Sequence, residues 1–301
     1  MMPTDIESLH TRAEILTEAL PYIREFYGKT IVVKYGGHAM VDDALKSDVM
    51  SDLILMKYVG MKPVLVHGGG PQISGLLERV GKKSEFVNGL RVTDEDTALL
   101  AEMALVGSVN KDIVGMLNQL GASAVGLSGK DANLIQARKH YAVVQNGDDE
   151  SSEVDIGFVG EITQVNPHII QVLESQGFIP VIAGTGVGKD GETYNINADT
   201  TAGEIAAALS AAKLILLSDI RGVLRDKDDP DSLISSIRAA DIPRLREEGV
   251  FSAGMIPKIQ ACSTALRGGV RKAHIIDGRI PHSLLHEVFT DGGIGTQLTN
   301  D

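Results

Sequence analysis

Two apolar runs in this chain end in glycine turns, and each carries a polar side chain near its end. Residues 31–37 read Ile-Val-Val-Lys-Tyr-Gly-Gly, and residues 64–72 read Val-Leu-Val-His-Gly-Gly-Gly-Pro-Gln. Glycines let backbone N–H groups approach an anion closely, and a helix that begins after the turn adds the positive end of its dipole. Because Lys34 lies in the first run, the pattern predicts a phosphate site with the charge neutralisation that phosphoryl transfer needs.

The second turn and a downstream arginine each have two explanations. Glycines followed by Pro71 are also typical of an ordinary strand-to-helix turn. Arg91 stands just before a predicted helix N-cap at Thr93 or Asp94. It is either a surface residue or, because a guanidinium presents parallel donors, a ligand for a carboxylate.

Three further motifs place polar side chains at the ends of predicted elements. In residues 195–199 (Asn-Ile-Asn-Ala-Asp), an extended backbone would direct three polar side chains to one side, although helix capping explains one or two of them. Asp219 follows a buried apolar run, where open α/β sheets bind ligands. Lys258 falls in the first turn of a predicted helix, where a cation opposes the dipole, so an anionic ligand explains it better.

Residues 183–190 resemble a nucleotide-binding P-loop but lack its key positions. Ala183 stands where the first glycine belongs, and Asp190 where a serine or threonine would contact magnesium. The dinucleotide pattern G-x-G-x-x-G fails as well, because Lys189 takes the last glycine position. We expect a flexible loop here, which weakens the P-loop NTPase and nicotinamide dehydrogenase hypotheses.

Composition limits the class of protein and its partners. The 301 residues carry a net charge of −12, which disfavours nucleic acid or an anionic membrane as the main partner. The single cysteine, Cys262, excludes an internal disulfide, and we find no signal peptide and no apolar stretch of spanning length. We therefore expect a cytoplasmic protein.

Short β-branched runs alternate with helical patterns, which predicts a three-layer αβα sandwich around a mostly parallel central sheet. Strands are expected at 30–35, 63–67, 124–127, 178–183, 213–218 and 272–276. Helices are expected at 42–59, 71–80, 94–106, 108–120, 166–177, 199–212, 240–248, 255–268 and 281–290. The polar residues 145–152 are typical of a hairpin tip between runs at 140–144 and 156–164.

The first 27 residues carry apolar side chains at alternating spacings of three and four, from Ile6 to Tyr27. This pattern predicts a helix with one apolar face. Pro21 removes a backbone donor and should kink the helix. The resulting bent arm either packs on its own subunit or bridges two subunits.

Taken in this order, the motifs resemble the amino acid kinase family, from about residue 28 to the C-terminus: Lys34, the glycines, Arg91, the 195–199 run, Asp219 and Lys258. The resemblance implies the carbamate-kinase-like αβα fold. It also implies an oligomerisation arm at 1–27, an N-lobe at 28–190 for the acylated amino acid and dimerisation, and a C-lobe at 191–301 for ATP and an effector. The likeness is to members that use ATP and Mg²⁺ to phosphorylate the γ-carboxylate of N-acetyl-L-glutamate in arginine biosynthesis.

The resemblance also assigns roles to individual residues. Lys34 and Lys258 match the two transition-state lysines, and Asp219 matches the acid that orients them. Substrate contacts are implied at Gly68, Gly69, Arg91 and Asn195, and ATP contacts at Gly36, Gly37, Asn197, Asp199 and Ser218. The resemblance implies no metal site on the protein, because Mg²⁺ arrives bound to ATP. A carboxylate nucleophile is already ionised at neutral pH, so His38 and His67 are expected to be structural or adjacent to the substrate rather than bases.

Regulation is implied by the same resemblance. Members inhibited by L-arginine have an extra N-terminal helix and form ring-like hexamers, trimers of dimers joined by those helices. This chain is similar to them in its N-terminal arm and in residues 273–279, 287 and 292–296. Effector contacts are therefore expected at Tyr22, His274, Glu287 and Gly293, in a homohexamer. The nitrogen-signalling PII protein binds some members and is a candidate partner.

Other functions stay open at this point. A sister kinase would act on glutamate, aspartate or carbamate. A catalytically silent arginine-sensing subunit would keep the fold, but the two lysines and Asp219 argue against it. A nicotinamide dehydrogenase is disfavoured because the dinucleotide pattern is incomplete.

Overall fold

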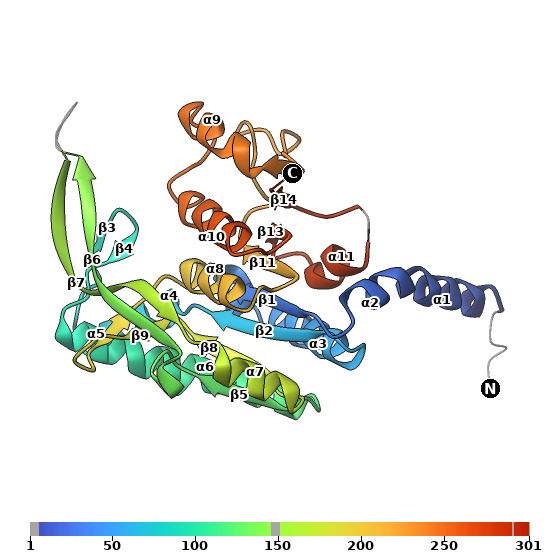
Figure 1. Ribbon diagram of the computed structural model, residues 1–301, viewed down its shortest axis with the longest axis horizontal. Helices are drawn as coiled ribbons and strands as arrows, with labels where there is room; N and C mark the ends of the chain where they lie inside the picture. Colours follow the sequence, from blue (N-terminus) through green and yellow to red (C-terminus); the bar gives the residue numbers. More distant parts are fainter. Residues whose placement is uncertain (1–5, 146–150, 291, 301) are drawn as a thin grey trace.

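An eight-stranded sheet lies at the centre of the computed structural model (Figure 1). The structure describes residues 6–145, 151–290 and 292–300. Its strand order is β12-β14-β13-β11-β1-β2-β8-β5. Neighbouring strands run parallel except β13 and β14, so the expected mostly parallel sheet is confirmed. Its strands are β1 (Thr30–Tyr35), β2 (Lys62–His67), β5 (Ala124–Leu127), β8 (Ile179–Ala183), β11 (Lys213–Ser218), β12 (Ser236–Arg238), β13 (Lys272–Asp277) and β14 (Thr296–Thr299).

The two faces of the sheet have separate cores, because side chains alternate along each strand. Ile31 and Val33 of β1 belong to one core and Val32 to the other. Helices cover both faces (Figure 1), which confirms the expected αβα sandwich. The first core includes residues of α3 (Asp43–Tyr58), α6 (Asn110–Gln119) and α11 (Ser283–Phe289), and the second includes residues of α7 (His168–Ser175), α8 (Ala198–Ala208), α9 (Ile242–Glu247) and α10 (Ile256–Arg267).

A π-helix joins two of the predicted helices. Helix α5 (Glu95–Glu102) continues through the π-helix η2 (Met103–Val109) into α6 without a break. The residue pattern predicts separate helices at 94–106 and 108–120, so the helical content is confirmed and the predicted gap between them is wrong. A π-helix is rare and often lies at a functional site, because its extra residue redirects the side chains that follow.

A second, smaller sheet closes into a barrel beside the main one. Strands β6 (Ile135–Gln145) and β7 (Ser151–Val165) form a long antiparallel hairpin, which joins β9 (Thr185–Val187) and β10 (Thr193–Asn195). The predicted hairpin is confirmed, and the part of its tip at 146–150 lies outside the described residues. The expectation of a flexible loop at 183–190 is wrong, because β9 forms within it and pairs with β10.

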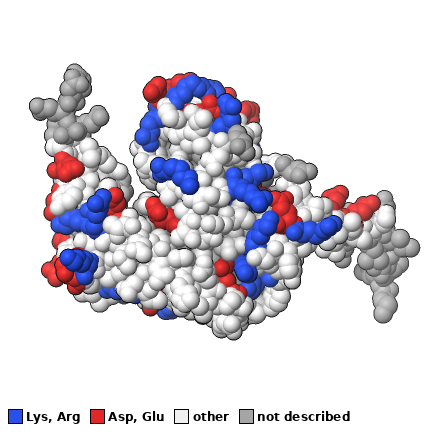
Figure 2. Space-filling view, in the orientation of Figure 1, with Lys and Arg blue, Asp and Glu red and all other residues white. Residues whose placement is uncertain are grey.

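Short elements connect the larger ones. They are η1 (Gly37–Met40), α4 (Gly70–Arg79), β3 (Phe86–Val87), β4 (Leu90–Arg91), η3 (Asp131–Asn133) and η4 (Ala239–Asp241). In the described part of the chain, no helix is long and apolar enough to cross a membrane. The face shown in Figure 2 mixes both signs of charge, with acidic and basic side chains side by side where the N-terminal arm meets the body.

Two helices form the N-terminal arm, which projects from the body (Figure 1). They are α1 (Ile6–Glu18) and α2 (Leu20–Phe26), and Pro21 lies in the first turn of α2, so the predicted kink is confirmed. Phe26 is buried in the core that contains α3, which anchors the base of the arm. Leu16 on α1 is 74% exposed, so this apolar side chain has little cover within the described chain.

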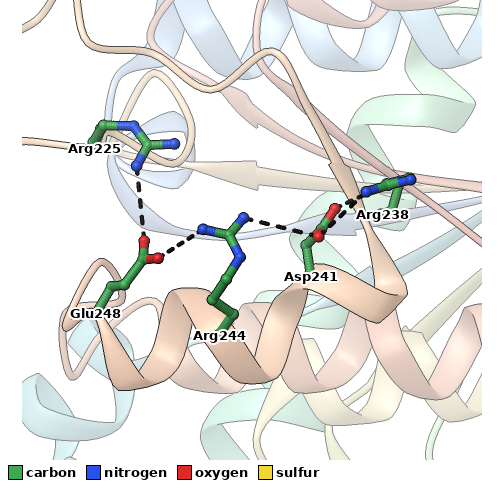
Figure 3. A network of polar contacts seen from close by, with 5 residues as sticks. All are labelled: Arg225, Arg238, Asp241, Arg244 and Glu248. Atoms are coloured by element: carbon green, nitrogen blue, oxygen red, sulfur yellow. Dashed lines mark hydrogen bonds and ion pairs between the residues drawn. The ribbon is translucent and has the colours of Figure 1, made fainter.

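Ion pairs on the surface connect α9 to the segment that follows β11. Figure 3 shows the chain of contacts, which runs from Arg225 through Glu248, Arg244 and Asp241 to Arg238. The shortest links are Arg244 Nη1 to Glu248 Oε1 at 2.6 Å and Arg238 Nε to Asp241 Oδ2 at 2.9 Å. Exposed pairs each contribute at most about 1 kcal/mol, so this network orients α9 more than it stabilises the fold.

Candidate functional site

A cavity of about 250 Å³ opens at the carboxyl ends of β1 and β2. Parallel strands bring their carboxyl ends to one edge of a sheet, and loops there commonly bind ligands. The cavity is lined by nine of the residues predicted from the sequence: Lys34, Gly36, Gly37, Gly68, Gly69, Arg91, Asn195, Asn197 and Asp199. The two glycine turns, distant in the sequence, therefore face the same space.

Asp199 lies between the two predicted lysines. Lys34 Nζ is 3.1 Å from Asp199 Oδ1, and Lys258 Nζ donates a hydrogen bond of 2.8 Å to Oδ2. Burial favours the neutral form of Asp199, but the two lysines outweigh it and keep the pKa of this carboxyl below its ordinary value. In this structure Asp199 is an acid that lies between the two lysines, and the expected role of Asp219 as the acid that orients them stays a prediction.

The placement of Asp199 depends on how helix α8 begins. Asn197 is its N-cap, and the side-chain oxygen accepts from the N–H groups of Asp199 and Thr200 at 2.8 and 3.2 Å. Of the two explanations given for residues 195–199, capping is therefore confirmed for Asn197, and the chain turns into the helix at Ala198. That turn carries Asp199 under the lysines instead of leaving it beside Asn195 and Asn197 on one strand face.

The first glycine turn lies against the end of β11. A Cβ added at Gly37 would stand 2.5 Å from Asp219 Oδ1, and the φ of Gly37 is +70°, so only glycine fits there. Ser218 ends β11, and its carbonyl accepts from Gly278 N–H at 2.8 Å. The structure thus brings Ser218 and Asp219 next to the predicted ATP turn, on the strand beside β1.

Arg91 is held at the edge of the cavity by uncharged acceptors. Its guanidinium donates to Ser84, to Ser74 Oγ at 2.8 Å and to the Gly70 carbonyl at 3.2 Å. It also lies over the ring of Phe86, 4.7 Å from the centroid. These acceptors fix the orientation of the guanidinium without neutralising it, so the charge is available to an anionic ligand.

One supporting residue was missed in the sequence. Glu102, at the end of α5, accepts from Thr193 Oγ1 at 2.8 Å and pairs with Lys130 at 2.9 Å. These contacts tie α5 to β10, the strand that carries Asn195. No sequence signal could find this role, because Glu102 and Thr193 are far apart in the chain and belong to no shared motif.

A second cavity, of about 420 Å³, lies where the arm meets the C-terminal part of the chain. All four predicted effector residues line it: Tyr22, His274, Glu287 and Gly293. His274 Nδ1 lies 2.6 Å from Glu287 Oε1, and Lys213 Nζ lies 3.5 Å from the same oxygen. Burial opposes the ionisation of Glu287, but His274 and Lys213 hold its pKa below the ordinary range. The cavity therefore contains a charged acceptor on a buried wall.

Sequence comparison finds close relatives. The family model described as "Amino acid kinase family" matches residues 29–277. Curated proteins from Pelotomaculum thermopropionicum and Moorella thermoacetica, both named acetylglutamate kinase, are 59% and 57% identical to this chain. The matches cover 95% and 94% of this chain, and 97% and 96% of the relatives.

Structure comparison agrees on the fold. N-acetylglutamate synthase from Neisseria gonorrhoeae, solved with coenzyme A and N-acetyl-glutamate, is 27% identical with a TM-score of 0.80 over 96% of this chain, which spans 63% of that structure. The same synthase solved with coenzyme A and L-arginine is 25% identical, with a TM-score of 0.77 over 96% of this chain and 65% of that one. Carbamate kinase from Giardia lamblia, at 17% identity and a TM-score of 0.65 over 91% of this chain and 99% of that one, is similar in fold alone. This chain therefore belongs to the amino acid kinase family.

Proposed function

We infer that the acetylglutamate kinase activity of this chain, a step of arginine biosynthesis, takes place in the cavity at the carboxyl ends of β1 and β2. The reaction transfers the γ-phosphoryl group of ATP to the γ-carboxylate of N-acetyl-L-glutamate, so it must bring two anions together. One observation carries the inference: Lys34 and Lys258, from opposite parts of the chain, meet on the buried Asp199. Two cations fixed in this way are ready to stabilise charge on a transferred phosphoryl group.

The chemistry needs few other groups. The attacking carboxylate is ionised at neutral pH, so no general base is required. Each preorganised donor to the transferring group contributes about 3–4 kcal/mol in the transition state. Bound to the ATP phosphates, Mg²⁺ would add positive charge. In the described part of the chain no cluster of His, Cys, Asp and Glu side chains is arranged to hold a metal.

We assign the ligand contacts by geometry and charge. Arg91 faces the cavity with an uncompensated guanidinium and is the proposed contact for a substrate carboxylate, together with Asn195 and the N–H groups of the second glycine turn. Gly36, Gly37, Asn197, Ser218 and Asp219 are the proposed ATP side. The boundary between the proposed lobes, 28–190 and 191–301, falls in the turn of the β9–β10 hairpin. The cytoplasm stays the expected location.

Acyl-phosphate trapping tests the reaction. We would incubate the protein with ATP, Mg²⁺ and hydroxylamine, and compare N-acetyl-L-glutamate with L-glutamate, L-aspartate and carbamate. Hydroxamate from the acetylated substrate alone is the expected result. Preferred turnover of another acid would support a sister kinase, and no turnover with any of them would support a silent arginine-sensing subunit.

Feedback inhibition by L-arginine is the second part of the proposal. The cavity at the base of the arm holds the Glu287 carboxylate, which suits a guanidinium, and Tyr22 places helix α2 of the arm on its wall. The similar synthase solved with L-arginine supports the same ligand class. The exposed Leu16 and Ile15 on α1 support a homohexamer joined through the arms, because an apolar helix face needs a partner. PII is proposed only as a further partner of such a hexamer.

Deleting residues 1–26 tests the arm, and Glu287→Gln tests the cavity. We expect the deletion to lower the molar mass measured by light scattering below that of a hexamer and to abolish inhibition by L-arginine.

Glu287→Gln should raise the inhibitory arginine concentration at least about tenfold while the hexamer persists, because the charge-assisted acceptor is lost. A deletion variant that stays hexameric and arginine-sensitive would refute the proposal.

A further inference from the structure

His67, the last residue of β2, lies directly before the second glycine turn, and the proposed reaction gives it no part. Its side chain is fully buried, as is that of Asn110, the first residue of α6. Asn110 Nδ2 lies 3.1 Å from His67 Nε2 and 2.9 Å from the Val181 carbonyl, and His67 Nδ1 lies 2.8 Å from the Gly68 carbonyl. These four residues form one continuous buried chain, which we call the Asn110–His67 chain.

The carbonyl groups at the two ends determine the direction of every bond in it. The Val181 carbonyl only accepts, so Asn110 must present its NH₂ group there and toward His67 Nε2. His67 Nε2 is therefore an acceptor, and the proton sits on Nδ1, which donates to the Gly68 carbonyl. A second proton on the ring would face the Asn110 NH₂ group. Burial, with a smaller effect of Lys111, lowers the pKa of His67 to about 4, so the neutral ring is the stable form near pH 7.

The orientation of the Gly68 carbonyl has a geometric effect on the next N–H group. The structure contains no cis peptide bond in its described residues, and in a trans peptide the C=O and the following N–H point in opposite directions. His67 draws the Gly68 carbonyl toward the core, so the Gly69 N–H points away from the core. Gly69 lines the cavity, so this donor faces the space in which the substrate carboxylate would receive the phosphoryl group.

Without this chain the peptide between Gly68 and Gly69 would be free to turn over. Glycine occupies both signs of φ with little cost, so two successive glycines offer little resistance to a peptide flip. The flip would aim a carbonyl oxygen, instead of an N–H, at an anionic phosphoryl group. Gly68 N–H cannot replace the lost donor, because it already donates to the Tyr35 carbonyl at 3.1 Å.

The π-helix η2 explains how Asn110 reaches His67. Asn110 follows directly after η2, and two side chains of η2 lie against the glycine turn. A Cβ added at Gly69 would stand 2.6 Å from Leu105 Cδ2 and 3.3 Å from Val109 Cγ2. The extra residue of a π-helix shifts the register of the side chains that follow it. The same segment therefore closes one side of Gly69 and delivers Asn110 to the imidazole.

We propose that Asn110 and His67 are positioning residues for phosphoryl transfer, which hold the Gly68–Gly69 peptide with the Gly69 N–H directed at the transferring group. The proposal rests on the proposed function, because it assumes that the anion binds in this cavity. The alternative is that the buried pair only packs and satisfies its own polar atoms.

His67→Asn and His67→Leu separate the two explanations. The amide nitrogen of asparagine stands where His67 Nδ1 stands and can still donate to the Gly68 carbonyl, whereas leucine fills the space without a donor. We expect His67→Leu to lower kcat by about tenfold to a hundredfold, with KM for N-acetyl-L-glutamate changed by less than about threefold. His67→Asn should keep kcat within about threefold of the wild type. If the side chain only packs, His67→Asn should lose more kcat than His67→Leu, because leucine is closer to histidine in volume.

Asn110→Leu and nitrogen NMR keep the test decisive if a His67 variant does not fold. Asn110→Leu should lower kcat as His67→Leu does, because Asn110 acts on the turn through its contact with His67. In wild-type protein with ¹⁵N-labelled histidine, the ring signal that is absent from His67→Asn should carry its proton on Nδ1 and show no titration between pH 5.5 and 8. A proton on Nε2, or titration in this range, would overturn the proposal. Wild-type protein without turnover would refute the proposed function and this inference together, whereas active wild type with equal kcat in both His67 variants would refute the inference alone.

Discussion

Lys34 and Lys258 contact different oxygens of the Asp199 carboxylate, at 3.1 and 2.8 Å, although Lys34 lies in strand β1 and Lys258 in helix α10. Asp199, which lines the cavity together with Lys34, offsets the repulsion between the two cations and holds Lys258 beside Lys34. Because one buried carboxylate carries a single negative charge, the trio retains a net positive charge for an incoming phosphoryl group.

Replacing Lys34 by methionine should lower kcat at least about a hundredfold and change either KM much less, because the lysine acts mainly on charge that develops in the transition state. Steady-state assays with ATP and N-acetyl-L-glutamate measure the split. Lys46→Met is the matched control, since Lys46 pairs with Asp43 on the surface of α3. A change confined to KM would make Lys34 a binding residue only.

Asp199→Asn should destabilise the protein and slow the reaction. It leaves two buried ammonium groups without their counter-charge, and breaking a buried ion pair in this way costs about 3–5 kcal/mol. Urea unfolding measures the loss, with Asp231→Asn in an exposed turn as the control. Equal stability of the wild type and Asp199→Asn would show that the lysines do not depend on this carboxylate.

Arg91→Lys should weaken substrate binding specifically. Lysine keeps the charge but loses the fork that reaches Ser84, Ser74 and the Gly70 carbonyl. We expect KM for N-acetyl-L-glutamate to rise about tenfold, the equivalent of about 1.4 kcal/mol, with KM for ATP nearly unchanged. Arg138→Lys on the exposed β6–β7 hairpin should leave both KM values unchanged. A larger effect on ATP would move Arg91 to the nucleotide side.

Gly37→Ala should raise KM for ATP, because the new methyl group would collide with the Asp219 carboxylate and the positive φ strains any other residue. Gly81→Ala is the matched control. Its φ is +79°, close to the +70° of Gly37, but no atom lies within 4 Å of an added Cβ. The same KM for ATP in both variants would show that the collision with Asp219 does not affect ATP binding.

The pair of His282 and Asp52 should make stability depend on pH. His282 Nδ1 lies 2.6 Å from Asp52 Oδ1; burial raises the pKa of Asp52 to about 6, and the hydrogen bond to Asp52 raises the pKa of His282. Because both folded pKa values lie above the unfolded ones, the folded state binds more protons, and stability falls as pH rises through these values.

Asp52→Asn tests this sign directly. Between pH 5 and 8 the Tm of the wild type should fall relative to that of Asp52→Asn, as measured by differential scanning fluorimetry at each pH. Asp43→Asn on the same helix is the control, because Asp43 is exposed to solvent and its hydrogen bond with Lys46 lowers its pKa. Parallel curves for the wild type and Asp52→Asn would contradict the prediction.

Local patterns were sufficient where a single element determines the outcome. The strands expected at 30–35, 124–127 and 213–218 have the bounds found in the structure, because each is a short apolar run between polar or glycine residues. The two glycine turns reached the same cavity, since they follow neighbouring parallel strands, which share their carboxyl edge.

Features that depend on contacts between distant segments were not predictable. Asp199 and Asp219 are both acids near predicted element ends, and only the start of α8 at Ala198 shows that Asp199 lies between the lysines. The π-helix between α5 and α6 has no turn or proline signal, so its register had to come from packing against Gly69. Strand β9 formed in a glycine-rich segment because β10 pairs with it.

The pairing of β1 with β11 also has a consequence for biosynthesis. Val33 aligns with Ile215 in the middle of the sheet, so the first strand made by the ribosome waits for most of the chain before it gains this neighbour. Its other neighbour, β2, is available much earlier. The glycine turns of β1 and β2 can therefore assemble during translation, whereas Lys258 reaches Asp199 only near the end of synthesis.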